Sequence, residues 1–432
     1  MTQNIVLTNN NSTLKKAIWF YFWLWLLEGA LRKWVLPGLS TPLLVVRDPI
    51  AIYICYLAIK QKLHYHNSYV VIGYFSCIFA FILSLLIGHQ NLLVGLYGAR
   101  IYLFHFPLVF IIGKIFTAED VLKFGKIMLL LMIPMSVIII LQFSSPQSAW
   151  INRGVGGDIS GAGFTGSMGY SRPPGTFSFI SGLVNFIKLY TPFLVFFFMG
   201  YSKCSKWILF VSAIAFLLAL PLTISRGAVA SVILVVIFAT FTALRKTENL
   251  YRIIVACFFV FLLIVLALQI ELFKLGIEVF LARFEAAANA EGNVSEITQN
   301  RVLGGILGGI SDIFQQPLFS GNLGIGSNVA AKLLTGQRAF LGGEGALGQM
   351  AFEYGLIFGL LLFIMRLLLA INFAIKSWSV VRYGGPLAWL LVPNVIFILA
   401  FGGFNLTYDL GYFVMAAGLL IASLKFKSLS GK

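Results

Sequence analysis

Charged residues are scarce in this chain. Asp, Glu, Lys and Arg make up 11% of its 432 residues, whereas hydrophobic residues make up 59%. A soluble globular domain carries roughly 25% charged residues. Apolar blocks recur along almost the whole sequence, and a helix of about 20 apolar residues crosses the hydrocarbon layer of a membrane. The composition therefore excludes a soluble domain and predicts an all-α, polytopic membrane protein.

Several kinds of chemical site are missing as well. The chain has four Cys and four His, and none of them form a cluster with the spacing of a metal site. Each Cys lies in an apolar run or at the expected cytoplasmic face, so a disulfide framework is not expected. There is no Walker A loop, no dinucleotide glycine fingerprint and no Asp-x-Asp pair. These absences disfavour an ATP-driven machine and a nucleotide-sugar enzyme, and we expect neither a metal nor a cofactor.

What the chain does contain is a series of long apolar runs, which predict about twelve transmembrane helices in one domain, residues 1–432. The first apolar run is not followed by the small residues of a signal-peptide cleavage site. We therefore expect this run to be an uncleaved transmembrane helix. No repeat relates the two halves of the chain, which weakens a transporter interpretation. The expected spans are residues 17–36, 42–60, 69–88, 93–113, 121–143, 178–199, 205–222, 227–244, 250–270, 346–370, 386–402 and 407–424.

The two basic residue types are distributed differently. With both termini in the cytoplasm, the inner segments hold 17 of the 31 basic residues, and 14 of these are Lys. The other 14 lie in spans or outside, and ten of them are Arg. The positive-inside rule explains the Lys residues and predicts a multi-pass protein of the bacterial inner membrane. The net charge of +16 is therefore not a nucleic-acid footprint.

The outward Arg residues suggest a phosphate-bearing ligand. A guanidinium group is a planar fork that binds phosphate through two hydrogen bonds, whereas Lys acts as a hydrated point charge. The alternative is that these Arg residues extend their charged ends to the membrane surface or pair with carboxylates such as Glu28 and Asp48. Glu28 and Arg32 are four residues apart on one helical face, so we expect them to form a structural pair.

Two polar interruptions predict loops on the periplasmic side. The smaller, residues 144–177, is rich in Gly and Ser and ends in Arg172-Pro-Pro-Gly175 immediately before a span. The diproline fixes the backbone, and Gly175 permits an unusual dihedral angle. A cation held there beside a helix N-terminus is a candidate anion site, although a proline-stiffened turn with a solvated Arg is the simpler interpretation.

The larger loop, residues 271–345, separates the ninth and tenth spans. Residues 303–314 have the apolar spacing of a helix that either lies on the bilayer surface or caps the helix bundle. Glu344 follows in a Gly-rich context, as either an acid–base group or a solvated loop acid. Outside this loop, Arg226 lies in a very short connection between two spans. An Arg at membrane depth is costly unless it is paired or wetted, so Arg226 is a functional candidate.

Four segments in order resemble the O-antigen ligase and O-antigen polymerase family of lipid-linked glycan transferases. They are Arg172-Pro-Pro-Gly-Thr-Phe, Thr223-x-Ser-Arg226-Gly, Asn300-Arg301 followed after a helix by Pro317-Leu-Phe-Ser-Gly-x-Leu-Gly-Ile-Gly, and Glu353-Tyr-Gly-Leu-Ile-Phe-Gly. The resemblance is clearest over residues 170–360. It implies a GT-C-like transferase with one large periplasmic loop.

The resemblance implies a metal-independent glycosyltransferase that acts at the periplasmic face on an undecaprenyl-diphosphate-linked glycan. Arg172, Arg226, Arg301 and Arg338 would bind the diphosphate, and Arg226 would also be catalytic. Family ligases carry a His where this chain has Glu344, so Glu344 is the expected catalytic base by substitution, with Asp409 as the second choice. The missing His favours polymerisation of repeat units for O-antigen or exopolysaccharide.

Two other functions stay open at this point. One is ligase-type transfer of the glycan to a lipid or protein acceptor, and the other is transport of a lipid-linked saccharide. The implied partners of the polymerase are the lipid-linked donor, a saccharide acceptor, membrane lipid and a chain-length regulator protein.

Overall fold

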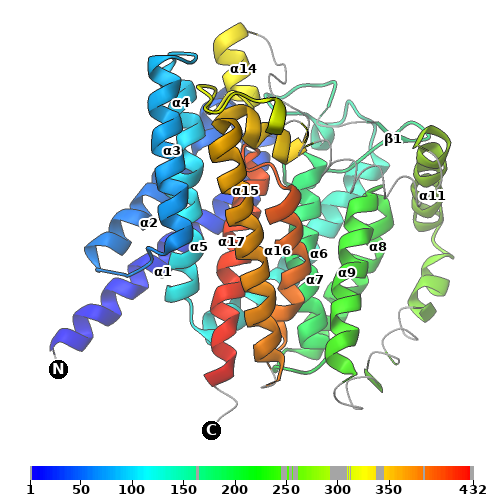
Figure 1. Ribbon diagram of the computed structural model, residues 1–432. Helices are drawn as coiled ribbons and strands as arrows, with labels where there is room; N and C mark the ends of the chain where they lie inside the picture. The colour runs from blue at the N-terminus through cyan, green and yellow to red at the C-terminus, as the bar shows by residue number, and fades with distance from the viewer. Residues whose placement is uncertain are drawn as a thin grey trace.

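The computed structural model is a bundle of mostly vertical helices (Figure 1). It describes residues 2–161, 165–244, 251–252, 255, 261–291, 309, 311, 313–336, 345–382 and 385–428. The two chain ends are marked at the lower end of the bundle in Figure 1, and the opposite end carries β1 and α14. We call that opposite end the distal end.

The helices and strands have the following bounds. In chain order they are α1 (Thr2–Ala30), η1 (Leu31–Val35), η2 (Pro37–Leu39), η3 (Pro42–Val45), α2 (Asp48–Lys60), α3 (Ser68–Leu86), α4 (Leu92–Arg100), η4 (Ile101–His105), α5 (Phe106–Ile115), α6 (Ala118–Ser144), η5 (Trp150–Asn152), β1 (Thr165–Ser167), β2 (Tyr170–Ser171), α7 (Ile180–Phe198), α8 (Lys206–Leu222), α9 (Arg226–Ala243), α11 (Glu271–Glu291), α14 (Asn328–Thr335), α15 (Gly345–Val381), α16 (Leu387–Phe401), α17 (Thr407–Ser423) and η7 (Leu424–Ser428).

Eight helices in the described part of the chain are long and apolar enough to cross a membrane. Two further apolar helices, α8 and α16, are shorter. The expected spans between residues 42 and 199 agree with these helices to within a few residues, because uninterrupted apolar runs fix them. Within the expected span 250–270, residues 250, 253–254 and 256–260 lie outside the described residues. The total of twelve spans therefore stays a prediction.

Three helical stretches form the centre of the bundle. The apolar windows of Leu92–Ile115, Ile180–Phe198 and Thr407–Phe426 are each 72% buried, against 28–44% in the other candidate spans. The last of these contains α17, which packs against α5, α7 and α16. Helices that are apolar all round belong inside a bundle, where neighbouring helices replace lipid. The peripheral helices therefore face lipid with much of their surface.

Buried charges tie the end of α1 to α2 and α17. Glu28 accepts hydrogen bonds from Arg32 Nη1 at 3.3 Å, from Arg47 Nε at 3.2 Å and from Thr407 Oγ1 at 3.2 Å. Arg47 also donates to the Thr407 carbonyl oxygen. The expected pair between Glu28 and Arg32 is thus confirmed, and Arg47 joins it. The network is structural, because every charge in it is satisfied by protein.

A second network connects α1, α2 and the α4–η4 helix. Asp48 Oδ1 lies 2.9 Å from Arg100 Nη1 and 2.8 Å from His105 Nε2. His105 Nδ1 in turn lies 2.8 Å from the hydroxyl of Tyr21. Arg32, Arg47 and Arg100 are therefore paired with carboxylates. For these three residues the structural alternative to phosphate binding is the correct one.

Helix α15 is two helices joined at a sharp turn. Gly355 has φ 77° and ψ −179°, which breaks the helix. The parts on either side pack together, since a Cβ added at Gly359 would meet the Cα of Ala351 at 3.1 Å. The backbone after the turn also binds the preceding loop, with Leu356 N donating to Pro317 O at 2.9 Å. The span expected over residues 346–370 falls within the candidate span Leu347–Val381. The break at Gly355 was not expected, and it arises because Gly355 adopts a backbone angle that other residues avoid.

The segment 317–327 lies against α3 and α4 through glycine contacts. A Cβ at Gly98 would meet the backbone nitrogen of Gly324 at 2.5 Å, and one at Gly88 would overlap Gly321. His89 Nε2 lies 3.0 Å from the Leu323 carbonyl oxygen. These contacts hold the segment at the distal end of the bundle.

Both predicted loops contain regular structure. Residues 144–177 include η5 and an antiparallel hairpin of β1 and β2. The larger loop region includes α11 at its start and α14 near its end. The Gly-rich sequence of this loop predicted turns, and α14 was not expected. Most of the expected amphipathic helix lies outside the described residues. Of its described positions, Ile313 is buried as expected, whereas Phe314, which the spacing placed on the same apolar face, is exposed.

Replacing Glu28 with Ala is expected to destabilise the protein strongly. The substitution removes the carboxylate that Arg32 and Arg47 share inside the protein, and loss of one partner of a buried pair costs about 3–5 kcal/mol. The apparent melting temperature in detergent measures the effect. As a control, Lys15→Ala breaks the partly exposed pair with Asp120, which is worth about 0–1 kcal/mol. Equal shifts for the two variants would contradict the structural role of Glu28.

A methyl group at Gly98 is expected to displace the segment 317–327. The added Cβ would meet the backbone of Gly324, which cannot move aside as a flexible side chain can. Hydrogen–deuterium exchange should therefore become faster for the amides of residues 321–326 in Gly98→Ala. Gly38→Ala is the control, because no atom lies within 4 Å of its added Cβ. Unchanged exchange in Gly98→Ala would show that the segment is held by other contacts.

Candidate functional site

The backbone next to Arg172 is held in a rigid turn. It follows β2 directly and is followed by two buried prolines and by Gly175, whose φ of +60° confirms the unusual dihedral angle expected there. Gly175 is fixed from two sides: its N–H donates to Gln142 Oε1 at 2.8 Å, and its carbonyl accepts from Lys33 Nζ at 2.8 Å. The turn before α7 therefore holds Arg172 in place.

Arg226 is the first residue of α9. Helix α8 ends at Leu222, so only three residues connect the two helices, as the sequence predicted. Ile224 adopts φ +48° in this turn, and Ser225 caps α9 by accepting a hydrogen bond from Ala228 N at 3.3 Å. The N-terminus of a helix carries a partial positive charge. Helix α9 therefore adds to the positive potential around Arg226.

The structure brings Arg172 and Arg226 together and adds Arg283 from α11. Burial lowers the pKa of half-buried Arg172, and the positive charges of Arg283 and Arg226 lower this pKa further. The Cζ atom of Arg226 lies 5.9 Å from the ring centre of Phe284, next to Arg283. We call Arg172, Arg226 and Arg283 the arginine cluster. Like charges gathered in this way favour the binding of an anion.

Arg283 was not singled out from the sequence, although it counted among the outward Arg residues. Its position in an apolar, crowded stretch gave no spacing that linked it to Arg226. Only the packing of α11 against α8 and β1 brings it to the cluster. Arg301, Arg338 and Glu344 lie outside the described residues, so their expected roles stay predictions.

Asp409 lies apart from the arginine cluster in its contacts. It is in the first turn of α17 and accepts a hydrogen bond from Asn185 Nδ2 at 2.6 Å. The cations that act on it electrostatically are Lys188 and Arg366. Asp409 therefore belongs to a second polar region, formed around the turn between α16 and α17.

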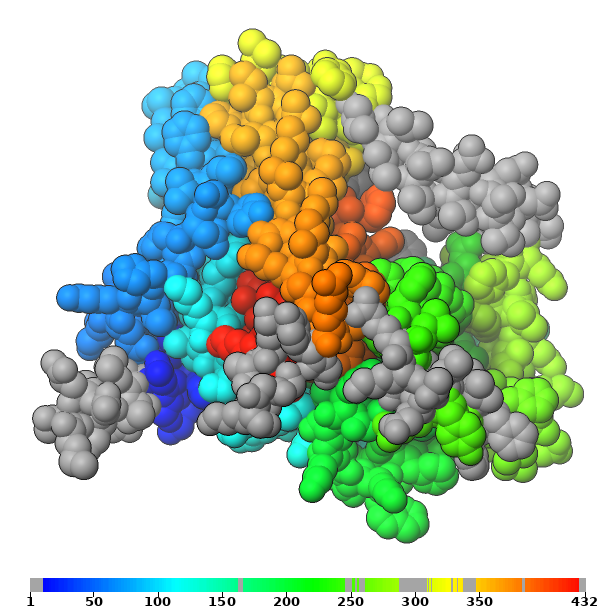
Figure 2. All heavy atoms as spheres, turned by 60° about the horizontal axis from the view of Figure 1, so that its bottom comes forward, coloured from blue at the N-terminus to red at the C-terminus, as the bar shows by residue number. Residues whose placement is uncertain are grey.

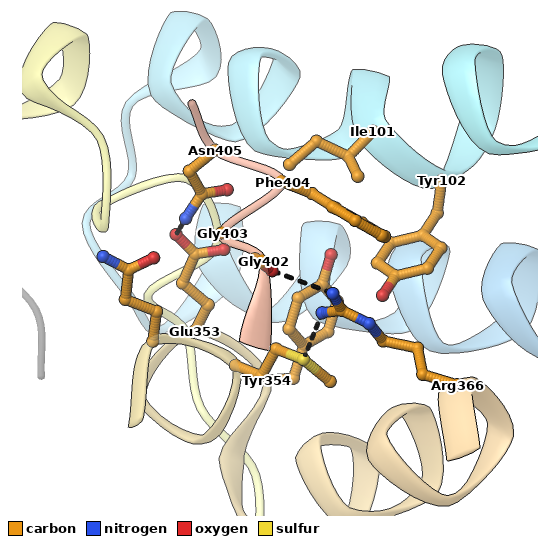
Figure 3. A pocket seen from close by; sticks show the side chains of 11 residues that line it. Ile101, Tyr102, Glu353, Tyr354, Arg366, Gly402, Gly403, Phe404 and Asn405 are labelled. Carbon is orange, nitrogen blue, oxygen red and sulfur yellow. Dashed lines mark hydrogen bonds between the residues drawn. The ribbon is translucent and has the colours of Figure 1, made fainter. Parts of the chain in front are cut away.

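A pocket lies beside this turn (Figure 3). The space inside it that a water-sized molecule can occupy is about 20 Å³. That is room for about one water molecule. Polar and aromatic groups from η4, α15 and the α16–α17 turn line it, and they are Tyr102, Gln349, Glu353, Tyr354, Arg366, Phe404 and Asn405.

The pocket contains a carboxylate and a guanidinium group, both almost fully buried. Glu353 Oε1 accepts from Asn405 Nδ2 at 2.8 Å and from Gly326 N at 2.9 Å. Arg366 Nη2 donates to the carbonyl oxygens of Gly402 at 2.8 Å and Ile398 at 3.0 Å. In the sequence Glu353 stands out only as part of a motif, and Arg366 does not stand out, because no spacing relates the two residues.

The arginine cluster and the pocket lie at the same end of the bundle. Helix α9 packs against α7 and α16. Arg226 starts α9, and Gly402 follows the last residue of α16, so both are at the distal ends of neighbouring helices (Figure 1). Figure 2 turns the end that carries the termini toward the viewer, and in that view the orange-red part of the chain lies apart from the yellow-green part that includes α11. The distal end thus combines an anion-binding group with a polar pocket.

Inorganic pyrophosphate is expected to stabilise the protein through the arginine cluster. The apparent melting temperature should rise with pyrophosphate concentration, because a ligand that binds only the folded state stabilises it. Arg283→Gln should weaken this response about tenfold or more, since a hydrogen bond to a charged group contributes about 1.5–3 kcal/mol. It should not lower the melting temperature without pyrophosphate, because the substitution also removes like-charge repulsion. A pyrophosphate response equal to that of the unmodified chain would contradict anion binding by Arg283.

Comparison with known proteins does not assign the chain to a family. No family model, no curated protein and no solved structure matches it. The function is therefore argued from the chemistry of the arginine cluster and its surroundings.

Proposed function

We propose that this protein is a membrane glycosyltransferase that polymerises undecaprenyl-diphosphate-linked oligosaccharide repeat units. The observation that supports it is the arginine cluster, in which Arg172, Arg226 and Arg283 approach one another at the distal end. A diphosphate leaving group gains charge as its bond to the sugar breaks, and preorganised cations stabilise that charge. Guanidinium groups suit this task because they bind phosphate oxygens in pairs.

The proposed reaction exchanges one C–O bond for another. A hydroxyl oxygen of the acceptor sugar attacks the anomeric carbon of the donor, and the bond from that carbon to the diphosphate oxygen breaks. The bonding electrons leave with the diphosphate, and the hydroxyl proton passes to a carboxylate base. Glu344 is the proposed base and Asp409 the second choice, while Arg301 and Arg338 are proposed as further diphosphate ligands. A general base contributes about 10²–10⁴-fold to such a step.

The proposed orientation places the distal end in the periplasm of a bacterium and both termini in the cytoplasm. Lys residues gather at the end that carries the termini: Lys425 Nζ donates to the carbonyl oxygens of Phe116 and Lys114, and Lys15 pairs with Asp120. Such an excess of basic residues is typical of the cytoplasmic side. A periplasmic arginine cluster would meet the lipid-linked glycan after its transfer across the inner membrane.

Replacing Arg226 is expected to abolish polymerisation. With purified lipid-linked repeat units, Arg226→Ala should give little or no product, because a stabilising charge on the leaving diphosphate is lost. Arg226→Lys should also be strongly impaired, since Lys cannot form the bidentate contact. Arg382→Ala serves as the control. Arg382 is exposed and directly follows the C-terminal end of α15, away from the arginine cluster. Full-length product from Arg226→Ala would eliminate the proposed mechanism.

The same assay separates the proposed function from its alternatives. A ladder of repeat units on the carrier lipid indicates polymerisation, whereas transfer to one fixed acceptor indicates a ligase. Glu344→Gln should reduce turnover more than donor binding if Glu344 is the base. Mass spectrometry of the lipid-linked pool tests the transporter alternative, which predicts movement of the saccharide without a new glycosidic bond.

A further inference from the structure

Lys33 lies inside the protein without a carboxylate to balance its charge. It belongs to η1, directly after α1, and its side chain is 1% exposed. No carboxylate of the described residues lies within 4 Å of its amine. Glu28, the acid that precedes it in α1, is already bound to Arg32 and Arg47. A buried charge is costly unless it is paired, so a lysine is an expensive residue at a position that only fills space.

The ammonium group of Lys33 binds the turn that follows Arg172. Its Nζ atom donates to the carbonyl oxygen of Gly175 at 2.8 Å, and it lies 4.5 Å from the ring centre of Trp34. A hydrogen bond from a charged donor is stronger than one between neutral groups. Because 142 positions of the chain separate Lys33 from Gly175, this bond joins the end of the first helix to the segment before α7.

Gly175 is also held by Gln142 of α6. Gln142 Nε2 donates to the Gly175 carbonyl oxygen at 3.2 Å, and the N–H of Gly175 donates to Gln142 Oε1 at 2.8 Å. Both polar groups of this backbone position are therefore bound, and the carbonyl receives two donors. If Lys33 were absent, the carbonyl would keep the bond from Gln142, so no buried acceptor would be left without a partner.

The diproline 173–174 transmits the position of Gly175 to Arg172. A proline ring fixes φ near −65°, and the residue before a proline is restricted to extended conformations. Few backbone angles are therefore free to change between Arg172 and Gly175. On the other side of Arg172, the ring of Tyr170 stacks on Phe143 of α6, with the ring centres 4.8 Å apart. Arg172 thus lies between two anchored points of the backbone.

A fixed Arg172 is important because the other members of the arginine cluster repel it. The positive charges of Arg283 and Arg226 act on it, and these residues belong to two other elements, α11 and α9. Without an anion, a mobile Arg172 would turn away from these charges. Cations that are held in place before the ligand arrives need no rearrangement when it binds, and this preorganisation strengthens binding.

We propose that Lys33 is a positioning residue for diphosphate binding, an inference that rests on the anion-binding role of the arginine cluster in the proposed function. Lys33 itself does not touch the ligand. It acts through Gly175 and the diproline 173–174, which hold Arg172 beside Arg226 and Arg283. The bond from the first helix to this turn thereby contributes to the geometry of the anion site.

Lys33→Met separates this positioning role from a role in stability. Methionine has a similar length and fills the same space, but it removes the charge and the hydrogen-bond donor. Replacing buried charges with apolar side chains of similar volume is often neutral or stabilising. The melting temperature without ligand should therefore not fall below that of Lys16→Met, which makes the same change at an exposed position of α1.

The assay measures how the apparent melting temperature of the purified full-length protein rises with the concentration of inorganic pyrophosphate. The affinity of Lys33→Met for pyrophosphate should be about three- to tenfold weaker than that of Lys16→Met, the range for one hydrogen bond. A double-mutant cycle with Arg172→Gln identifies the route. In that background Lys33→Met should change the affinity by less than about twofold, because the residue through which Lys33 acts no longer binds the anion.

Different outcomes would overturn different claims. Equal losses of affinity in the two backgrounds would overturn positioning through Arg172. Unchanged pyrophosphate affinity in Lys33→Met, or failure of this variant to fold, would make Lys33 structural and would also overturn the inference. An unmodified chain that does not respond to pyrophosphate would overturn anion binding by the cluster and this inference with it. If the cycle behaves as expected, full polymer from Arg226→Ala would overturn the proposed function alone.

Discussion

The structure depends on how buried charges are satisfied without water, and one short turn supplies several of the partners. The α16–α17 turn and its flanks offer the carbonyl oxygens of Gly402 to Arg366 and of Thr407 to Arg47, and the amide of Asn405 to Glu353. In hydrocarbon every polar group needs a partner from the protein, so helices with charges must converge where such partners exist. Arg47, at the start of α2, and Arg366 of α15 therefore both reach this turn, beside α17 in the centre of the bundle.

This requirement divides the arginines into two kinds. Arg32, Arg47 and Arg100 lie on carboxylates, so their charges hold helices together. In the arginine cluster, burial and then the like charges of Arg283 and Arg226 lower the pKa of Arg172. A group whose pKa is shifted by burial and by neighbouring charges is a candidate for a functional site.

Much of the fold and part of the site follow from local sequence patterns. Apolar runs located most of the described helices, and the four-residue spacing of Glu28 and Arg32 predicted their ion pair, because helix geometry alone brings such residues together. The short connection before Arg226 and the backbone angle at Gly175 were likewise determined locally. Arg301, Arg338 and Glu344 rest on the resemblance alone, since they lie outside the described residues.

The sequence by itself determined that the chain is a helical membrane protein and where two of its candidate anion ligands stand along it. Only the tertiary structure decided that Arg283 joins Arg172 and Arg226, that α15 turns back on itself at Gly355, and that Glu353 shares a pocket with Arg366. The physical reason is the distance along the chain over which each kind of interaction acts. Hydrophobic runs and helical spacing act between residues a few positions apart, whereas these sites form when separate helices pack, and no short-range pattern encodes which helices will be neighbours.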